Sequence, residues 1–389
     1  MKKIVFCILL IICSFIKILN FQVVAFGDPN WEQEGDWKYY VWKNNIYITD
    51  YIGSEVNISI PTEINGLNVR GISTLKNTII KTVVIPHTIK TISQKAFSKC
   101  NLLNEIIIPS SVEEIEDSVF YGCKNLKKAT ILSESISDYM FVGCRSLAEV
   151  NLGEGLKTIG ERAFANCENL KEIKLPESLT TIGHDAFAYT GLENIIIPES
   201  VEYIENGAFK ECENLKEVIF KNSNTIFEEV HGPTGKVTIT NAPTFDNSNN
   251  IATVYAPLTS QAEEFFSAKG IPVVPVVKVE VNGEEVKTDV PPILLEGRVL
   301  IPARAMFEAL GAQIGWEENT RTVTAMTSEK NVAMQIDNTQ MSVNGLTTEL
   351  DVAPRILINR TLVPARAISE SLGATVEWDE ERQTVVVTY

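Results

Sequence analysis

Basic residues are scarce in this sequence. Across 389 residues, 34 Lys and Arg stand against 50 Asp and Glu, which gives a net charge of −16. Contacts to nucleic-acid phosphates need clustered Lys and Arg, so this balance argues against a nucleic-acid-binding protein. Glycine and proline, at 22 and 16 residues, are too few for a collagen-like or low-complexity chain. With 44% apolar residues the chain is not wholly disordered, and its length predicts two or more domains.

Motifs for catalysis and metal binding are also missing. The sequence has no Gly-rich phosphate loop, no Gly-x-Ser-x-Gly elbow and no His-Glu-x-x-His helix. It has no Cys-x-x-Cys pair of the kind that binds zinc. The three histidines, His87, His184 and His231, are scattered, so we expect isolated surface residues rather than a metal site. We therefore expect no cofactor and no enzymatic activity.

The first segment has the layout of an export signal. Residues 1–3 are short and basic, residues 4–16 form an uncharged apolar run, and Ala25 supplies a small residue for cleavage. This predicts a signal peptide over residues 1–25. The alternative is an uncleaved anchor that uses residues 4–25. The apolar run is short for a membrane span and no second one follows, so we expect a secreted, extracellular or cell-surface protein with no transmembrane span after cleavage.

A repeat of about 23 residues follows. Six phenylalanines, spaced by 23, 21, 23, 23 and 22 residues, set its register: Phe97, Phe120, Phe141, Phe164, Phe187 and Phe209. Three residues after each comes a ladder of small residues: Cys100, Cys123, Cys144, Cys167, Thr190 and Cys212. Before the phenylalanine, a strand pattern with apolar alternation usually ends at a proline, as in residues 171–176. A fixed period of this length predicts a solenoid whose coils must stack to bury their apolar faces.

These residues resemble the BspA-type leucine-rich repeats of bacterial surface proteins. The pattern Cys-x-x-Leu-x-x-Ile-x-Ile-Pro-x-x-Val-x-x-Ile-Gly-x-x-Ala-Phe is followed closely from Cys167 to Phe187. The unit from Leu126 to Phe141 is shortened and lacks the proline, so we expect an irregularity there. Upstream, the aromatic residues near Trp37 suggest a cap over the open end of the array, because exposed terminal coils invite edge pairing.

A second repeat lies near the end of the chain, at an offset of 62 residues. Residues 298–305, which include Pro-Ala-Arg-Ala, recur as residues 360–367, and the Leu-Gly-Ala and Trp signatures recur with them. Each copy predicts a hairpin around Asn-Gly, a helix between Pro and Gly, and two strands. This part resembles the copper amine oxidase-like N-terminal domain, also called the stalk domain. Copper in those oxidases requires three histidines, and none of the histidines of this chain lies in this part.

The expected fold is a β-rich leucine-rich-repeat solenoid followed by a small α+β duplicated stalk-like domain. The expected segments are a signal peptide (1–25), an N-terminal cap with a degenerate first repeat (26–80), the repeats (81–220), a C-terminal cap (221–270), an extended linker (271–276) and the stalk-like domain (277–389). Because the two parts have separate repeat periods, we expect the solenoid to fold without the stalk-like domain.

Alternation along the first strand of each coil predicts which residues face outward. The outward residues, and hence the candidate binding surface, are Glu105, Ile107, Glu149, Asn151, Glu172, Lys174, Asn194, Ile196, Glu217 and Ile219. Isoleucine in three of these coils would form an apolar stripe, which often marks a contact site. The alternative is that loops or a partner cover the stripe.

The five cysteines of the mature chain share one repeated position. Metal binding or a catalytic thiol would need other spacings or a single instance with a partner base. Disulfides between neighbouring coils are possible by distance, at about 4.8 Å, but parallel side chains do not converge. We therefore expect five reduced, buried thiols that pack as small hydrophobes.

We expect, as the resemblance implies, an exported interaction or adhesion protein whose solenoid binds an extracellular protein or glycan, with a stalk-like spacer or wall-facing module. The alternative is an accessory enzyme that acts on cell-wall or extracellular polymer, which would need a cluster of carboxylates in a cleft.

Overall fold

The N-terminal end of the structure is an antiparallel meander that closes the first coil. The computed structural model describes residues 31–75, 79–227 and 243–389, so the expected signal peptide lies outside the described residues. The cap consists of β1 (Trp31–Glu34), β2 (Trp37–Trp42), β3 (Asn45–Tyr51), β5 (Glu63–Ile64) and β6 (Leu67–Ile72). Tyr39 is buried in this cap, whereas Trp31 and Trp42 remain exposed, so only part of the aromatic cluster covers the open end.

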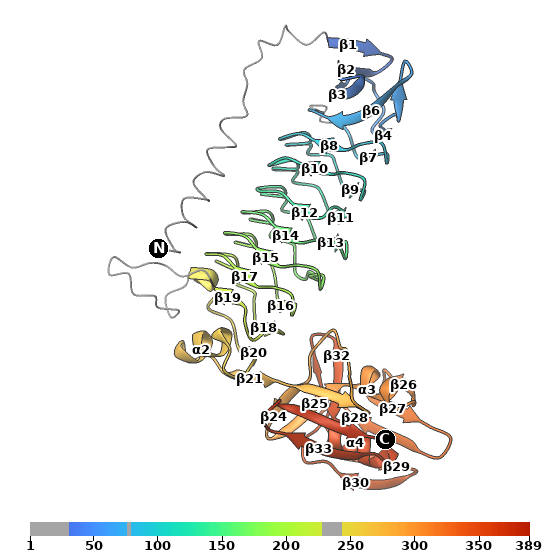
Figure 1. Cartoon of the computed structure of the whole chain (residues 1–389), viewed down its shortest axis with the longest axis vertical. Coiled ribbons are helices and arrows are strands. Elements are labelled where there is room, and N and C mark those ends of the chain that lie inside the picture. Colours follow the sequence, from blue (N-terminus) through green and yellow to red (C-terminus); the bar gives the residue numbers. More distant parts are fainter. Residues whose placement is uncertain (1–30, 76–78, 228–242) are drawn as a thin grey trace, which may run out of the picture.

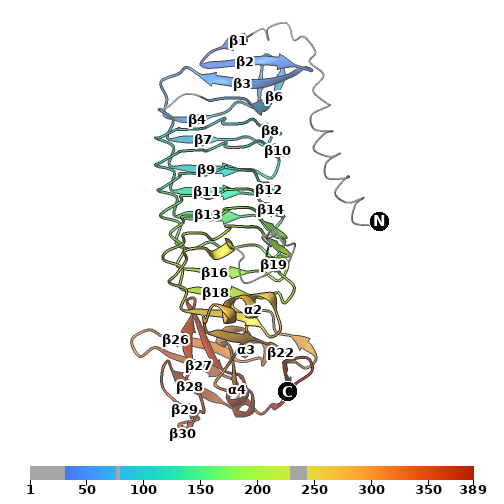
Figure 2. The ribbon, with the colours of Figure 1, turned by 90° about the vertical axis from the view of Figure 1, so that its left-hand side faces the viewer.

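The coils stack in parallel below this cap and form two ladders of strands (Figures 1 and 2). The first strands of the coils are β4 (Asn57–Ser59), β7 (Thr82–Val84), β9 (Glu105–Ile108), β11 (Lys128–Ile131), β13 (Glu149–Leu152), β16 (Asn194–Ile197), β18 (Glu217–Phe220) and β20 (Thr253–Pro257). The second strands are β8 (Thr91–Ile92), β10 (Glu114–Ile115), β12 (Ser135–Ile136), β14 (Thr158–Ile159), β15 (Thr181–Ile182), β17 (Tyr203–Ile204) and β19 (Ile226–Phe227). The predicted solenoid is confirmed.

Phenylalanine and cysteine fill the interior between successive coils. The six predicted phenylalanine rings stack nearly parallel, with centroids 5.3–5.5 Å apart, and all are fully buried. All five cysteines of the described chain are buried and reduced. Each thiol also donates a hydrogen bond to a carbonyl of the preceding coil, as Cys123 does to Phe97 O at 3.1 Å. The cysteine ladder therefore ties neighbouring coils together in addition to filling space.

A further coil follows the six that were predicted. Phe245, in the 3₁₀ turn η2 (Pro243–Phe245), stacks on Phe209 at 5.1 Å. Ser248 stands at the cysteine position, and its hydroxyl donates to Phe209 O at 2.6 Å. Residues 244–251 read Thr-Phe-Asp-Asn-Ser-Asn-Asn-Ile, a variant of the repeat that was missed because it lies 36 residues after Phe209.

The irregularity expected in the shortened unit after Leu126 lies in its second strand, because β12 does not pair with β10 and the second-strand ladder is divided there. The first strand of this unit is regular, since β11 pairs in register with both β9 and β13. The first-strand ladder is interrupted at another place. Residues 171–175, which the sequence predicted as a strand, form none. The ladder is therefore split into β4–β7–β9–β11–β13 on one side and the sheet that starts with β16 on the other.

The expectation of an extended linker at residues 271–276 is also corrected. It contains β21 (Val273–Val276), which pairs in parallel with β20 after the helix α2 (Gln261–Ala268). On its other edge β21 pairs with β24 (Ile293–Leu295) of the C-terminal domain, where Val276 lies opposite Ile293. One eight-stranded sheet therefore runs from the solenoid into the C-terminal domain without a free joint.

The C-terminal domain consists of two halves that repeat the same elements. The first half has β22 (Lys278–Val281), β23 (Glu284–Glu285), β24 (Ile293–Leu295), β25 (Arg298–Pro302), α3 (Ala303–Ala309), β26 (Gln313–Glu317) and β27 (Thr322–Met326). After β28 (Asn331–Gln335), the second half has β29 (Gln340–Val343), β30 (Leu346–Glu349), β31 (Arg355–Leu357), β32 (Arg360–Pro364), α4 (Ala365–Leu372), β33 (Thr375–Asp379) and β34 (Thr384–Thr388).

The two halves interlock around a pseudo-two-fold axis. Strands β25 and β32 pair antiparallel, and Ile301 lies opposite Val363, its own equivalent at the offset of 62. The first hairpin, β22–β23, pairs with β34 of the second half. The helices begin after Pro302 and Pro364, as predicted, and Gly373 ends α4 with φ of 107°, a conformation that glycine adopts readily.

Candidate interaction surface

The outward column of the first strands is the surface that the sequence proposed for binding. Side chains with substantial exposure are Glu105, Ile107, Glu149, Asn151, Glu172 and Lys174, and half-buried ones are Asn194, Ile196 and Glu217. Ile107 is 54% exposed and its neighbour in the preceding coil, Val84, is 60% exposed. An apolar patch therefore faces solvent near the N-terminal coils.

The expected apolar stripe does not continue to the last coils. Ile219 is 0% exposed, and Ile196 packs against the same apolar cluster. This cluster joins the solenoid residues Ile219 and Tyr255 to residues of the C-terminal domain: Val290, Ile293, Leu300, Val352, Leu357 and Leu362. The C-terminal domain thus covers the stripe, which corrects the expectation that Ile219 faces water.

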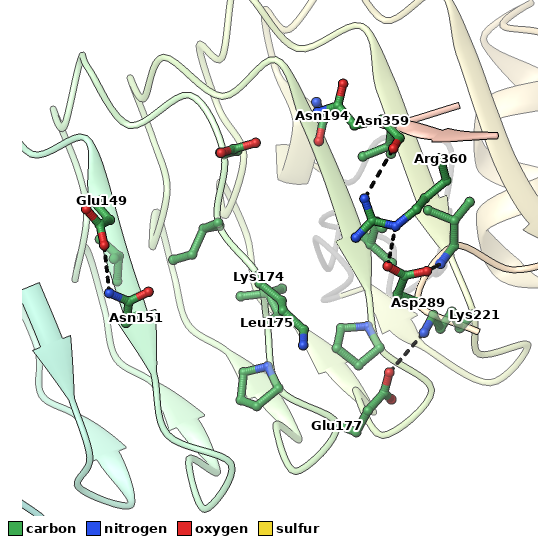
Figure 3. Close-up of a pocket in the computed structure, with 18 of the residues that line it drawn as sticks. Glu149, Asn151, Lys174, Leu175, Glu177, Asn194, Lys221, Asp289, Asn359 and Arg360 are labelled. Carbon is green, nitrogen blue, oxygen red and sulfur yellow. Dashed lines mark hydrogen bonds and ion pairs between the residues drawn. The ribbon is translucent and has the colours of Figure 1, made fainter. Parts of the chain in front are cut away.

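A pocket of about 530 Å³ lies where this domain meets the solenoid face. Its floor comes from β13, from residues 172–177 and from β16, and its wall comes from Asp289 and from residues 358–360 of the β31–β32 turn. Figure 3 shows Glu149 and Asn151 on one side of this space and Asn359, Arg360 and Asp289 on the other. Six of the predicted surface residues line it: Glu149, Asn151, Glu172, Lys174, Asn194 and Ile196.

Ion pairs hold the wall in place. Arg360 donates from Nε to Asp289 Oδ2 at 2.6 Å. Burial alone would raise the pKa of Asp289, but the Val290 amide and the Arg360 guanidinium outweigh it and lower that pKa. On the solenoid side, Lys221 donates to Glu177 at 2.9 Å and to the carbonyl oxygen of Thr288 at 3.0 Å. Lys221 therefore links the last coils directly to the C-terminal domain.

Other charges of the pocket are free to meet a ligand. Within the described chain, no ion pair joins Lys174, Glu154 or Glu172 to another residue. The side chains of Asn151, Asn194 and Asn359 add amide donors and acceptors from both sides of the pocket. The lining includes no aromatic ring. These groups offer hydrogen bonds to a ligand, and Lys174 is the cationic side chain of the pocket that has no ion pair within the described residues.

The carboxyl group of Glu217 and the phenol of Tyr255 lie just beyond the pocket, where the C-terminal domain covers the first strands. Burial raises the pKa of Glu217. Burial and then the nearby Glu217 raise the pKa of Tyr255 to about 12. Both shifts follow from the C-terminal domain, whose strands exclude water from this part of the sheet.

The sequence singled out neither the solenoid residues Glu154, Glu177 and Lys221 nor any residue of the C-terminal domain that lines the pocket. Asp289, Asn359 and Arg360 lie far from the repeats in sequence, and only the paired β21 brings them to the solenoid. The sequence feature that could have indicated Asp289 and Arg360 is the duplication of this domain. The Asp and Arg of the pair recur 62 residues apart as Asp351 and Arg298, a regularity that marks them as structural partners.

Metal and membrane features were also sought in the described ranges. Residues 31–75, 79–227 and 243–389 contain no group of three or more His, Cys, Asp or Glu residues placed to hold a metal ion. No helix within those ranges is long and apolar enough to cross a membrane.

Comparison with known proteins agrees with this architecture. The BspA type leucine rich repeat region matches residues 68–135 and 134–268 in six copies, and the copper amine oxidase N-terminal domain matches residues 280–387. The stacked coils define the chain as a leucine-rich-repeat solenoid protein. The repeat match spans more than half of the sequence, and the chain belongs to the BspA-type leucine-rich repeat family.

Several solved structures are similar in fold. A leucine-rich repeat protein from Bacteroides ovatus is 21% identical over 58% of this chain and 70% of its own, with a TM-score of 0.40. A leucine rich cell surface protein from Faecalibacterium prausnitzii is 20% identical over 64% of this chain and 95% of its own, with a TM-score of 0.34. A leucine-rich repeat protein from T. pallidum is 24% identical over 57% of this chain and 80% of its own, with a TM-score of 0.32. No curated protein matches the chain.

Proposed function

We propose that this protein is an exported, cell-surface-associated interaction protein without enzymatic activity. Its binding surface is the outer face of the first strands together with the pocket at the C-terminal domain. The observation that carries the proposal is the convergence of Asn151, Lys174 and Asn194 with Asn359 in one pocket, from parts of the chain remote in sequence. Concave sites with few, convergent polar groups are where ligands bind.

The basic start and apolar run of residues 1–25 support export, and membership of the BspA-type family supports a place at the cell surface. The partner is an extracellular protein or a glycan. The C-terminal domain serves as one wall of the site, a role closer to the ligand than that of a spacer.

Two carboxylates of the pocket, Glu149 and Asp289, do not have the property that an enzyme cleaving wall polymer would need. A glycoside hydrolase needs one carboxylic acid with a raised pKa as proton donor. Hydrogen bonds from Lys128 and Asn151 lower the pKa of Glu149, and that of Asp289 is lowered as well. Both groups are thus stabilised as carboxylates, which hold a ligand but do not protonate one.

A capture experiment tests the proposal. Immobilised residues 26–389 are exposed to extracellular matrix proteins and to purified cell-wall material, and bound material is measured. A triple variant, Asn151→Ala, Lys174→Ala and Asn194→Ala, changes the pocket, and a control, Lys157→Ala with Thr158→Ala, changes an exposed site beside the second strands. We expect the triple variant to lose capture and the control to keep it. Equal capture by all three proteins contradicts the proposal.

A further inference from the structure

The floor of the pocket contains a stretch of strand-like backbone that has no hydrogen-bond partner. In neighbouring coils the ladder begins with backbone bonds such as Ala148 N to Lys127 O at 3.0 Å. The equivalent bond from Lys171 to Ala148 is not formed, although Glu193 still donates to Lys171 O at 2.9 Å. Among the described residues, the N–H and C=O groups of residues 172–175 bond to no backbone or side chain. Backbone groups inside a sheet ladder normally pair with the neighbouring strands, so this run leaves unpaired donors and acceptors on the floor of the pocket.

The sheet is open as a slit at this place. Val150 and Ile173 point inward, yet both line the pocket on the outer face and are 8% and 9% exposed. Their counterparts in intact parts of the ladder, Ala129 and Ile195, are 0% and 1% exposed. Inward side chains reach the outer pocket only where the strands have parted. The edges of β13 and β16 that face the slit are open as well, because both strands end their sheets there.

The sequence contains a reason for the opening on the β16 side. In the other coils two residues separate the ladder Cys from the next Leu, but Thr190 and Leu192 are separated by Gly191 alone. The replacement of Cys by Thr190 is therefore accompanied by the loss of one residue from the same repeat. A Cβ atom at Gly191 would overlap the carbonyl oxygen of Glu168, so the corner is as tight as the backbone permits. Thr190 also donates to Phe187 O of its own coil, whereas the cysteines donate to the preceding coil.

We propose that the slit and the pocket bind an extended polypeptide segment of a partner protein. This rests on the proposed function and names the class of partner. Unpaired strand edges bind extended peptides through main-chain hydrogen bonds, and alternate side chains then enter pockets. Asparagine side chains carry the donor and acceptor of a peptide unit, and three of them surround the slit.

The pocket also favours a peptide over a sugar chain. Sugar rings are commonly held by stacking on aromatic side chains, and the lining contains none. Ile196, Ile358 and Val290 offer apolar contacts for a peptide side chain at the wall of the C-terminal domain. Lys174, with no ionic partner in the described chain, offers a contact to an acidic residue of the peptide.

Hydrogen exchange of the free protein tests the slit without any ligand. We expect the amides of residues 172–175 to exchange at least about 10-fold faster than the equivalent amides of β11, because only the latter are paired. A repaired variant replaces Thr190-Gly191 by Cys-Glu-Asn, which restores the two-residue spacing seen after Cys167 and Cys212. Repair should slow exchange over residues 172–175. Equal protection of both segments in the native protein overturns the inference.

Peptide binding is then measured with a phage-displayed library of random 12-residue peptides selected on residues 26–389. Selected peptides should bind the native protein. N-methylation of alternate backbone amides along one edge of the extended peptide should lower its affinity at least about 10-fold, whereas N-methylation along the other edge should be tolerated. This comparison leaves the protein unchanged and so holds even if the repaired variant does not fold. The Lys174→Ala variant should also bind them more weakly.

Two outcomes overturn the peptide inference while leaving the proposed function intact. One is a library that yields no peptide sensitive to Lys174→Ala or to N-methylation. The other is a glycan array on which the native protein binds a sugar at this pocket. If the native protein captures neither matrix protein nor cell-wall material, by contrast, the proposed function itself is contradicted.

Discussion

Arg360 and Asp289 join the two halves of the C-terminal domain, with Nε donating to Oδ2 at 2.6 Å. Their equivalents 62 residues away exchange roles, because Arg298 of the first half donates to Asp351 of the second half, also at 2.6 Å. The pair is thus formed twice across the pseudo-two-fold axis. Only the Arg360–Asp289 copy faces the solenoid, where it forms the wall of the pocket. A symmetric domain is therefore used asymmetrically.

The two copies should differ in their effect on stability. Asp289 is 46% exposed and also accepts a hydrogen bond from the Val290 amide at 2.9 Å, whereas Asp351 is 70% exposed. We expect Asp289→Ala to lower the free energy of unfolding by about 1–2 kcal/mol and Asp351→Ala by about 0–1 kcal/mol. Thermal unfolding of both variants measures the difference. Equal losses would show that docking on the solenoid leaves the pair unaffected.

The Asp289 contribution should also depend on pH. Its pKa is lowered in the folded protein, so the stabilisation is complete above the unfolded pKa of about 4. It is lost as the pH falls through the lowered pKa of the folded state. The difference in melting temperature between the native protein and Asp289→Ala should therefore be constant near pH 7 and shrink below about pH 4. A difference that grows as the pH falls would contradict this sign.

Removal of residues 277–389 should leave a folded but less stable solenoid. The cut removes the cover from Ile219 and Tyr255, whose burial stabilises the native chain by about 1.5–3 kcal/mol for each side chain. We expect a cooperative thermal transition at a lower temperature and a tendency to self-associate. Replacement of both residues by Ser should reduce self-association of the truncated protein and destabilise the full chain. A truncated protein without a cooperative transition would show that the solenoid does not fold alone.

With one residue between Thr190 and Leu192, position 191 should accept only glycine. A Cβ atom there would collide with the Glu168 carbonyl oxygen, which belongs to the backbone and cannot move aside. We expect Gly191→Ala to cost more than about 2 kcal/mol of stability. Gly155→Ala is the matched control, since a Cβ atom at Gly155 meets nothing within 4 Å. Denaturant unfolding compares the two, and similar stabilities would mean that the corner is looser than described.

The five thiols should be protected in the folded protein. Burial raises the pKa of Cys100 to about 12 and that of Cys212 to about 11, so little thiolate forms near neutral pH. Thiol titration of residues 26–389 should find few reactive groups in the native state and about five after denaturation without reductant. A single thiol in the denatured sample would indicate two disulfides and contradict the buried ladder.

The solenoid could be predicted because each repeat carries its own signal. Phenylalanine and cysteine recur at positions where only buried side chains fit, so periodicity alone placed them correctly. The coil that contains Phe245 was not predicted because an insertion separates it from Phe209. Its Ser248 nevertheless makes the same hydrogen bond to the preceding coil as the cysteines do. The sequence could not predict the gap in the ladder at residues 171–175. The alternation of apolar residues indicates which side chains are buried, but it does not show whether a neighbouring strand lies within hydrogen-bonding distance of the backbone.

The candidate site could be predicted only in part. Alternation placed Asn151, Lys174 and Asn194 on the outer face, which is a local property of the chain. It could not show that Ile219 is covered, because the cover comes from strands such as β32 that are remote in sequence. Val273–Val276 resembled a linker because of its proline, and only the pairing with β20 and β24 gives it its role.

Hydrogen–deuterium exchange of the complex tests the central claim most directly. Residues 26–389 are compared with and without the partner captured from matrix protein or cell wall. The account predicts protection at residues 149–151, 172–177, 194–198 and 358–360, which belong to both parts of the chain and meet at the pocket. Protection confined to the second strands near Thr158 and Thr181, or to the N-terminal cap, with the pocket unchanged, would contradict it.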